Sequence, residues 1–415
     1  MGTTSSARRY SVAVWLLALA ATHCKRAPPG EVGPSASASA AVSGSSPHDA
    51  FEPLPADLTA APLDGYTELA LTGSGGCAIH ASKRVACWGD RIHGQGTEWR
   101  SSQVPAWVAG LDSITRLSTG ASAVCATRES GETRCFGLGP WGTSAAGNYA
   151  FVPTRAPHLD GLTMAMSPEL GTGHGCGISA EGEVSCWGEG RVGATGIGEA
   201  PGFNPVGVIL RATAGRAVSV ACGRRHACAQ LASGQLICWG YGEGGALGDG
   251  VVHQRHCTFY NAPSAPGVLP GPQLRKCDGP EPVFLPRLAL AVGAIRLLAP
   301  NGQCAVTSES LRCWGKGWAA SPVDVSTGAP VAEIVELAGH DEVVCARSRA
   351  GEVTCLGEAP SGHLRFTPPR AVPELRGAKR LAARGLRVCA IVAGGGVRCI
   401  GKNPSGLELV DWTTR

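Results

Sequence analysis

The chain has 415 residues, of which 44% are hydrophobic and 16% charged, so its composition excludes wholesale disorder. Its formal net charge is +4 without a long basic run, which argues against nucleic-acid binding through a concentrated basic surface. The 59 glycines exclude a mainly helical protein and indicate short strands joined by tight turns, and the 18 cysteines indicate an oxidising compartment.

Residues 1–24 have the pattern of an export signal. Two arginines precede an apolar stretch at residues 12–21, which is shorter than the roughly 20 residues that a membrane-spanning helix needs. The segment ends in ATHC, which resembles a bacterial lipobox whose Cys24 receives lipid, although His23 stands where a small residue is usual. Plain secretion with a free Cys24 is the alternative. We expect export to the bacterial cell envelope, as an outer-membrane lipoprotein or in the periplasm, or else secretion.

Residues 25–62 are rich in Ala, Ser and Pro and contain almost no large apolar side chains. Such a segment cannot bury enough surface to offset its ordering entropy. We therefore predict a disordered tether between the export signal and the folded part of the chain.

The remainder, residues 63–415, contains seven copies of one unit that is marked by two cysteines. The fullest copy reads CAQLASGQLICWG from Cys228 to Gly240. In each copy two short apolar segments flank a turn, often with glycine, which is the pattern of a β-hairpin. The cysteines are ten residues apart in six copies and nine apart in the fifth, so they lie at matched distances from the turn.

Cysteines at matched positions face each other across a hairpin. Partners at a non-hydrogen-bonded position have Cα atoms about 4.5 Å apart, which a disulfide accepts. We predict one disulfide in every hairpin rather than zinc sites, because tetrahedral zinc sites usually use Cys-x-x-Cys pairs and none occurs here. The predicted pairs are Cys77 and Cys87, Cys125 and Cys135, Cys176 and Cys186, Cys228 and Cys238, Cys304 and Cys313, Cys345 and Cys355, and Cys389 and Cys399.

Further strand-like segments surround each hairpin. Apolar segments precede it at residues 217–221, 294–298 and 334–338, and a proline-containing extended segment follows it at residues 366–372. Four strands per repeat, seven times over, predict an all-β fold: a seven-bladed β-propeller of four-stranded blades with one disulfide per blade hairpin. A linear solenoid is the alternative, but it would need polar capping repeats and the last copy shows none.

The motifs of the fullest copy resemble a known family. GRRHAC at residues 223–228, WGYG at 239–242 and ALGDG at 246–250 are similar to the regulator of chromosome condensation repeat, and the resemblance covers roughly residues 65–412. It implies a seven-bladed propeller, here as an exported bacterial variant with paired cysteines. Nucleotide exchange and chromatin binding, known for nuclear relatives, do not transfer on fold alone. Relatives include a secreted inhibitor of β-lactamase, so an inhibitor-like role is one version of the expected function.

An insertion after the fourth copy, at about residues 250–282, departs from the repeat. A long loop on a rigid scaffold is a common place for function, and a disulfide between Cys257 and Cys277 would hold its shape. The alternative is an idle insertion. Cys222 is left over, either buried or paired in a way that the sequence does not indicate. The candidate binding residues of the insertion are Arg255, His256, Phe259 and Tyr260.

Other features have structural explanations. The G-x-G-x-x-G matches at residues 188–193 and 240–245 recur at one repeat position without a following helix, which favours turns over a dinucleotide site. The family histidine occurs only as His174 and His226, and we expect it to form a hydrogen bond within its blade. Tryptophans that follow the second cysteine favour packing between blades over a carbohydrate platform. They are Trp88, Trp187, Trp239 and Trp314.

These observations predict a binding protein. We find no nucleophile with a credible base, and we assign no catalytic, cofactor-binding or metal-binding residue. The expected partner is another protein or an envelope polymer, with no nucleic acid, contact with the membrane only through a lipid anchor, and a monomeric state. A hydrolase of the envelope with its site at the channel mouth is the alternative. Convergent carboxylates at the channel rim, or a histidine with an acidic partner there, would favour that enzyme.

Overall fold

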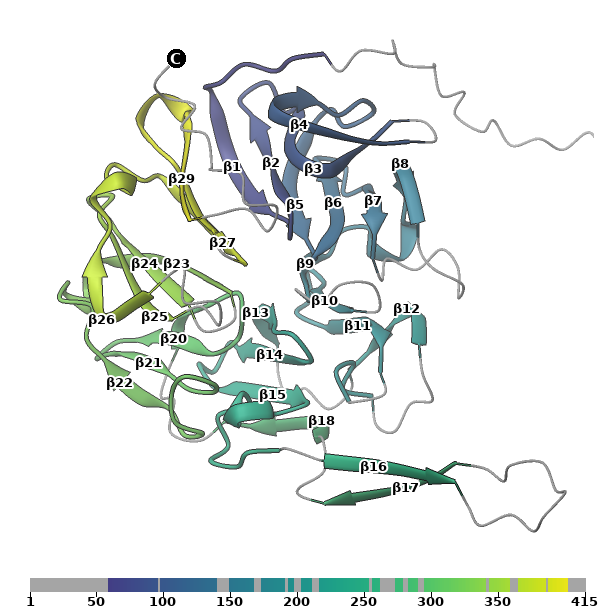
Figure 1. Ribbon diagram of the computed structural model, residues 1–415, viewed down its shortest axis with the longest axis vertical. Coiled ribbons are helices and arrows are strands. Elements are labelled where there is room, and N and C mark those ends of the chain that lie inside the picture. The colour runs from purple at the N-terminus through teal and green to yellow at the C-terminus, as the bar shows by residue number, and fades with distance from the viewer. Residues whose placement is uncertain are drawn as a thin grey trace, which may run out of the picture. The chain divides into compact units, whose positions relative to one another are not determined.

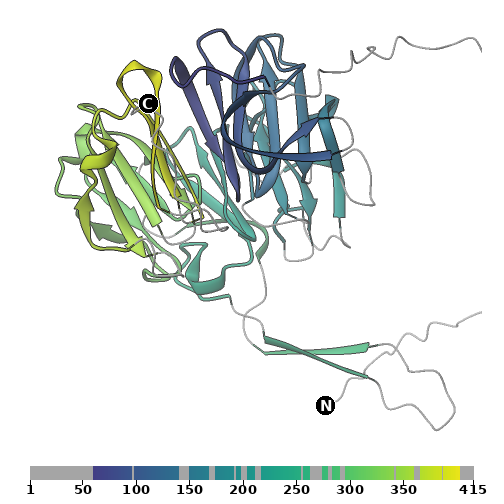
Figure 2. The same cartoon turned by 45° about the horizontal axis from the view of Figure 1, so that its top comes forward.

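The computed structural model describes residues 59–95, 98–139, 149–167, 173–190, 193–197, 203–210, 216–253, 256–261, 273–278, 283–289, 295–340, 343–358, 365–385 and 387–401. Within these residues seven antiparallel sheets follow one another in chain order around a centre, and every one except the fourth is built from consecutive strands (Figures 1 and 2). The predicted seven-bladed β-propeller is confirmed.

The first three blades each contain four strands. Blade 1 consists of β1 (Tyr66–Leu71), β2 (Gly75–His80), β3 (Val85–Gln95) and β4 (Glu98–Trp107). Blade 2 consists of β5 (Ile114–Thr119), β6 (Ser122–Arg128), β7 (Thr133–Leu138) and β8 (Tyr149–Arg155). Blade 3 consists of β9 (Thr163–Met166), β10 (His174–Ile178), β11 (Val184–Glu189) and β12 (Phe203–Ile209).

The next three blades have four strands as well, and blade 7 has three within the described residues. Blade 4 consists of β13 (Ala217–Cys222), β14 (His226–Leu231), β15 (Leu236–Gly240) and β18 (Val283–Leu288). Blade 5 consists of β19 (Ile295–Leu298), β20 (Cys304–Thr307), β21 (Leu311–Cys313) and β22 (Val323–Val325). Blade 6 consists of β23 (Ile334–His340), β24 (Val343–Ser348), β25 (Val353–Glu358) and β26 (Arg365–Ala371), and blade 7 of β27 (Arg380–Arg384), β28 (Arg387–Ile391) and β29 (Val397–Gly401).

Five short 3₁₀ turns connect these strands, and they are the only helical segments among the described residues. They are η1 (Pro157–Leu159), η2 (Glu243–Gly245), η3 (Val331–Glu333), η4 (Pro373–Leu375) and η5 (Ala393–Gly395). In the described part of the chain, no helix has the length and apolar character needed to cross a membrane.

The ring closes between its first and last blades. The innermost strand β1 contacts β27, just as β5 contacts β9 and β23 contacts β27. The Gly65 N–H donates a hydrogen bond to the Gly394 carbonyl at 3.2 Å, and Arg380 forms an ion pair with Glu68 at 3.0 Å. A solenoid would leave these two blades apart, so the closed ring excludes the linear alternative.

A disulfide joins the two middle strands of every blade, as the spacing predicts. Paired cysteines are direct cross-strand partners, for example Cys228 opposite Cys238, and their Cα atoms are 4.0–4.1 Å apart in all seven bridges. The turn between them needs glycine where φ is positive, as at Gly234 with φ of +83°.

The tryptophans fill the space between neighbouring blades. Trp239 of blade 4 is fully buried in a cluster with Val184 and Cys186 of blade 3, and its Nε1 donates to the Ala194 carbonyl at 3.0 Å. Trp314 of blade 5 repeats this arrangement against blade 4. The expected packing role is confirmed, because a ring buried between blades is not available for stacking on a sugar.

The insertion lies inside blade 4 rather than after it. The outermost strand of that blade, β18, follows the insertion in the sequence and pairs with β15. Between them β16 (His256–Asn261) and β17 (Gln273–Asp278) form a separate two-stranded antiparallel sheet, labelled in Figure 1. Sequence repeats alone did not reveal this position, because the copies were recognised by their middle hairpins and not by their outer strands.

The N-terminal predictions fall mostly outside the described residues. The whole export signal at residues 1–24 and nearly all of the tether at residues 25–62 lie outside the described residues. The described chain begins at Thr59, and the Ala61 N–H donates to the Pro105 carbonyl on β4 at 2.9 Å. The last residues assigned to the tether therefore pair with blade 1.

Candidate functional site

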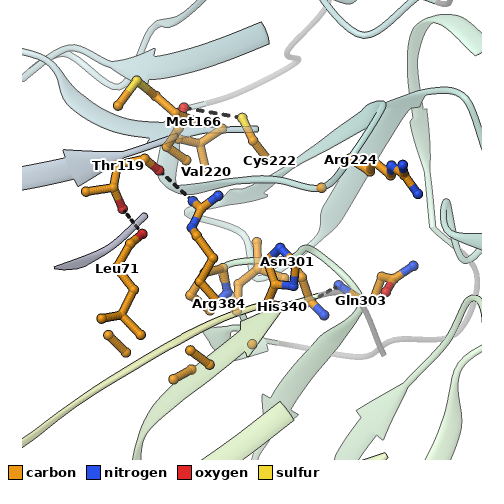
Figure 3. A pocket seen from close by; sticks show the side chains of 18 of the residues that line it. Leu71, Thr119, Met166, Val220, Cys222, Arg224, Asn301, Gln303, His340 and Arg384 are labelled. Carbon is orange, nitrogen blue, oxygen red and sulfur yellow. Dashed lines mark hydrogen bonds between the residues drawn. The ribbon is translucent and has the colours of Figure 1, made fainter. Parts of the chain in front are cut away.

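A pocket of about 630 Å³ lies at the centre of the propeller and is lined by residues of all seven innermost strands. These strands all run in the same direction along the channel, because each one begins its blade and is followed by the same antiparallel order. The pocket therefore collects residues from the C-terminal ends of these strands and from the turns that follow them. Figure 3 shows this region from close by.

One apolar residue from each innermost strand occupies the same register position and forms what we call the collar. Each of them pairs with the residue that follows the first cysteine of its blade, as Leu69 pairs with Ala78 and Val220 with Ala229. All but Leu337 line the pocket, and each packs toward the preceding blade. The collar consists of Leu69, Leu117, Met164, Val220, Leu298, Leu337 and Leu381.

Polar side chains stand beyond the collar, at the strand ends. Arg384, at the end of β27 in blade 7, is 8% exposed, and its Nη2 donates to the Thr119 carbonyl of blade 2 at 2.6 Å (Figure 3). The Thr119 hydroxyl donates in turn to the Leu71 carbonyl of blade 1 at 2.7 Å. A guanidinium thus ties three blades together in the wall of the pocket. The amide side chains of Asn301 and Gln303 from blade 5 are also buried in this wall.

The rim of the pocket carries positive charge on the arc formed by blades 4 and 5. Arg224 and Arg225 follow β13 and are exposed, and Lys316 of blade 5 is exposed as well. Among the described residues that line the pocket, Glu243 is the one carboxylate. A mechanism that requires two convergent carboxylates is therefore not available from these residues.

Cys222 is the free cysteine of the described residues, and it also lines the pocket. The residue is 3% exposed, and its thiol donates to the Ala165 carbonyl at 3.4 Å. Burial raises the pKa of this thiol to about 12, so the reactive thiolate is scarce at neutral pH. Of the two possibilities that the sequence left open, the structure shows the buried, unpaired cysteine.

The two family histidines form a relay of hydrogen bonds between blades. His174 Nε2 donates to the His226 carbonyl at 3.1 Å, and His226 Nε2 donates to the Asn301 carbonyl at 3.1 Å. The expectation of a bond within the blade was wrong, because the acceptor in each case belongs to the next blade. Burial lowers the pKa of His174 to about 3 and that of His226 to about 4, so both rings are neutral. Their role is structural.

The glycine-rich segment at residues 240–245 is a turn. Gly240, Gly244 and Gly245 have positive φ, and the segment passes into the three-residue turn η2 instead of a helix. A dinucleotide site requires a helix N-terminus for the pyrophosphate. No group of three histidine, cysteine or acidic side chains within the described residues is arranged to hold a metal ion.

The candidate residues of the insertion are not among those that line the pocket, and those that the structure describes belong to a separate sheet. His256, Phe259 and Tyr260 belong to β16, and Arg255 lies outside the described residues. The strand register places Cys257 opposite Cys277, the relation that the bridged cysteines have in the blades. A disulfide at this place stays a prediction.

Comparison with known proteins agrees with the repeat and the ring. A model of the regulator of chromosome condensation (RCC1) repeat matches residues 217–245. The crystal structure of human WBSCR16 is similar to the chain with a TM-score of 0.61 at 16% identity, covering 83% of this chain and 89% of that one.

A second solved structure, that of Prp20p from Saccharomyces cerevisiae, aligns with a TM-score of 0.47 at 14% identity over 83% of this chain and 69% of that one. At 16% identity the likeness to human WBSCR16 concerns the fold. The chain therefore contains a regulator of chromosome condensation repeat in blade 4 of a closed ring of seven blades.

Proposed function

We propose that the protein is an exported scaffold that binds another protein, with the hairpin β16–β17 as its main contact. The observation that carries this proposal is the interruption of blade 4: a separate two-stranded sheet is inserted between β15 and β18 while the blade itself remains complete. Loops on a rigid scaffold are common binding elements because they vary without cost to the core. A propeller of this repeat family is consistent with such a role.

The channel supports binding better than hydrolysis. Its described lining offers the single carboxylate of Glu243, and His226 is neutral and donates to a backbone carbonyl. General acid–base hydrolysis needs a pair of groups with matched protonation states within reach of one bond. The collar is apolar instead, which suits a surface that holds a ligand.

The hairpin itself suits protein recognition by its composition. Its β16 strand has the sequence HCTFYN, and aromatic residues are enriched among those that dominate the energy of protein interfaces. A bridge between Cys257 and Cys277 would hold the hairpin in its bound form and so reduce the entropy lost on binding.

The proposal predicts that binding depends on the two aromatic residues of β16. Full-length protein is used to retain partners from the envelope fraction of the parent organism, and the retained proteins are quantified by mass spectrometry. We expect a specific protein to be retained by the unaltered chain and reduced at least tenfold by the double substitution Phe259→Ala and Tyr260→Ala, since such a loss corresponds to about 1.4 kcal/mol.

The matched control removes exposed apolar side chains of the same connection but outside the hairpin. Val251 and Val252 are 40% and 42% exposed, and their replacement by alanine is expected to leave retention unchanged. If the same protein is retained equally by all three chains, the hairpin is not the contact.

We also propose that a lipid on Cys24 tethers the propeller to the envelope, with residues 25–62 as the spacer. The seven disulfides indicate an oxidising compartment, which supports export. We expect the unaltered protein to enter the detergent phase on Triton X-114 partition and Cys24→Ala to stay in the aqueous phase. An aqueous unaltered protein whose N-terminal peptide carries a free thiol would show plain secretion instead.

A further inference from the structure

We propose that the central pocket binds a small organic anion: a molecule whose apolar body contacts the collar and whose carboxylate lies at the basic rim. The proposal concerns a second site, separate from the hairpin, and does not depend on the protein-binding role.

The pocket has the size and rigidity of a ligand site. Its volume of about 630 Å³ falls within the range of roughly 300 to 1,000 Å³ that small-molecule sites occupy. Every innermost strand that lines it belongs to a sheet whose next two strands are joined by a disulfide. The site is therefore formed before a ligand arrives, and binding does not have to order its walls.

The collar supplies an apolar surface on all sides of the channel. Five collar side chains pack against the preceding blade but stay half-buried, so part of their apolar surface is exposed. They are Leu69, Leu117, Met164, Val220 and Leu298. These partly exposed surfaces face the same pocket. An alkyl or aromatic body placed there removes apolar area from water on both partners, at about 25 cal/mol per Å².

The rim selects the charge of the ligand. Arg224, Arg225 and Lys316 line the pocket on the side of blades 4 and 5, and Arg384 adds a buried guanidinium in the wall. The single carboxylate among the described lining residues, Glu243, leaves this side with an excess of positive charge. A carboxylate gains charge-assisted hydrogen bonds from such groups, whereas an ammonium is repelled.

The two parts of the site predict a ligand with two parts. An inorganic anion would use the rim and leave the collar in water, and a neutral apolar molecule would use the collar alone. Only an amphiphilic anion contacts the collar and the rim at once. We therefore expect it to bind more tightly than an inorganic anion or a neutral apolar molecule.

Three probes test this on the full-length protein by calorimetric titration: decanoate, decylammonium with the same chain length, and acetate, which has the carboxylate without the chain. Decanoate and decylammonium are used below their micelle concentrations. We expect decanoate to bind with a stoichiometry near one, acetate at least tenfold more weakly, and decylammonium at least tenfold more weakly. Salt should weaken decanoate binding, because the rim charges are exposed to solvent.

Two variants locate the site. The double substitution Arg224→Glu and Arg225→Glu reverses the charge of the two exposed rim arginines. We expect it to lower the affinity for decanoate at least tenfold and to raise the affinity for decylammonium. The control Arg376→Glu reverses the charge of an exposed arginine that directly follows η4, outside the pocket, and is expected to change neither affinity. Ser118→Trp places a large side chain in the pocket from the half-buried Ser118 and is expected to abolish decanoate binding while a cooperative thermal transition is kept.

Two results would overturn the proposal. The first is an absence of decanoate binding to the unaltered protein. The second is decanoate affinity that is the same in the charge-reversed, pocket-filled and control variants, which would place the probe on the outer surface.

Discussion

Reduction of the seven blade disulfides is expected to unfold the propeller. A bridge that closes a loop of about ten residues restrains the unfolded chain by about 2 to 3 kcal/mol in the entropic model, and the seven loops do not overlap in the sequence. Their combined contribution is roughly 15 to 20 kcal/mol, which exceeds the total stability of about 5 to 15 kcal/mol that is usual for a domain.

The measurement compares two samples unfolded in guanidinium, one with and one without reductant, and then diluted. We expect the unreduced chain to regain a cooperative unfolding transition and the reduced, alkylated chain to show none. Removal of one bridge by Cys228→Ala with Cys238→Ala should lower the free energy of unfolding by about 2 to 3 kcal/mol. The control Cys222→Ala removes a buried thiol without a bridge and should cost less.

Thiol counting checks the pairing independently. Seven bridges leave four of the 18 cysteines, namely Cys24, Cys222, Cys257 and Cys277. The denatured, unreduced chain should therefore react at no more than four thiols. A higher count would show that the blade cysteines are not all paired. A reduced chain with the same guanidinium midpoint as the unreduced one would show that the disulfides do not stabilise the fold.

Acidification to about pH 4.5 is expected to destabilise the propeller by about 5 kcal/mol through two histidines. Burial lowers the pKa of His174 to about 3 and that of His226 to about 4, whereas an unfolded histidine has a pKa near 6.5. Well above pH 6.5 both rings are neutral in both states and the full stability is present. Below it the unfolded chain binds protons that the folded chain excludes, at about 1.4 kcal/mol per pH unit for each ring.

The test follows the free energy of unfolding by guanidinium titration from pH 7 to pH 4.5. The double substitution His174→Gln and His226→Gln keeps a donor for each backbone carbonyl but cannot be protonated. We expect its loss of stability over this interval to be smaller by about 5 kcal/mol than that of the unaltered chain. Equal losses in the two chains would show that carboxylates elsewhere cause the acid sensitivity and that the histidines do not.

Much of the fold could be predicted from the sequence because its signals are local. A disulfide across a hairpin requires equal distances from one turn, so the spacing of Cys228 and Cys238 is sufficient to place both strands. Seven such units also required a closed or stacked arrangement, and the absence of capping repeats correctly favoured the ring. Trp239 was assigned to packing because its strand position recurs.

The central pocket could not be predicted, because ring closure brings together residues from one end of the sequence to the other. Arg384 donates to Thr119, 265 positions earlier in the chain, and no local pattern indicates that contact. The acceptors of the histidine relay lie in neighbouring blades for the same reason. The collar did leave a readable signal: in five blades an apolar residue stands eight positions before the first cysteine, at Leu69, Leu117, Val220, Leu337 and Leu381.

The free cysteine has a consequence for the order in which the chain is oxidised. In every blade the bridge joins two cysteines with no other cysteine between them in the sequence, but Cys222 stands between the bridge of blade 3 and Cys228 of blade 4. With Cys24 blocked by lipid, an oxidant that joined thiols strictly in their order of synthesis would link Cys222 to Cys228 and shift every later pair by one. The native set therefore requires each hairpin to form before its sulfurs are oxidised, or an isomerase that corrects the misplaced links.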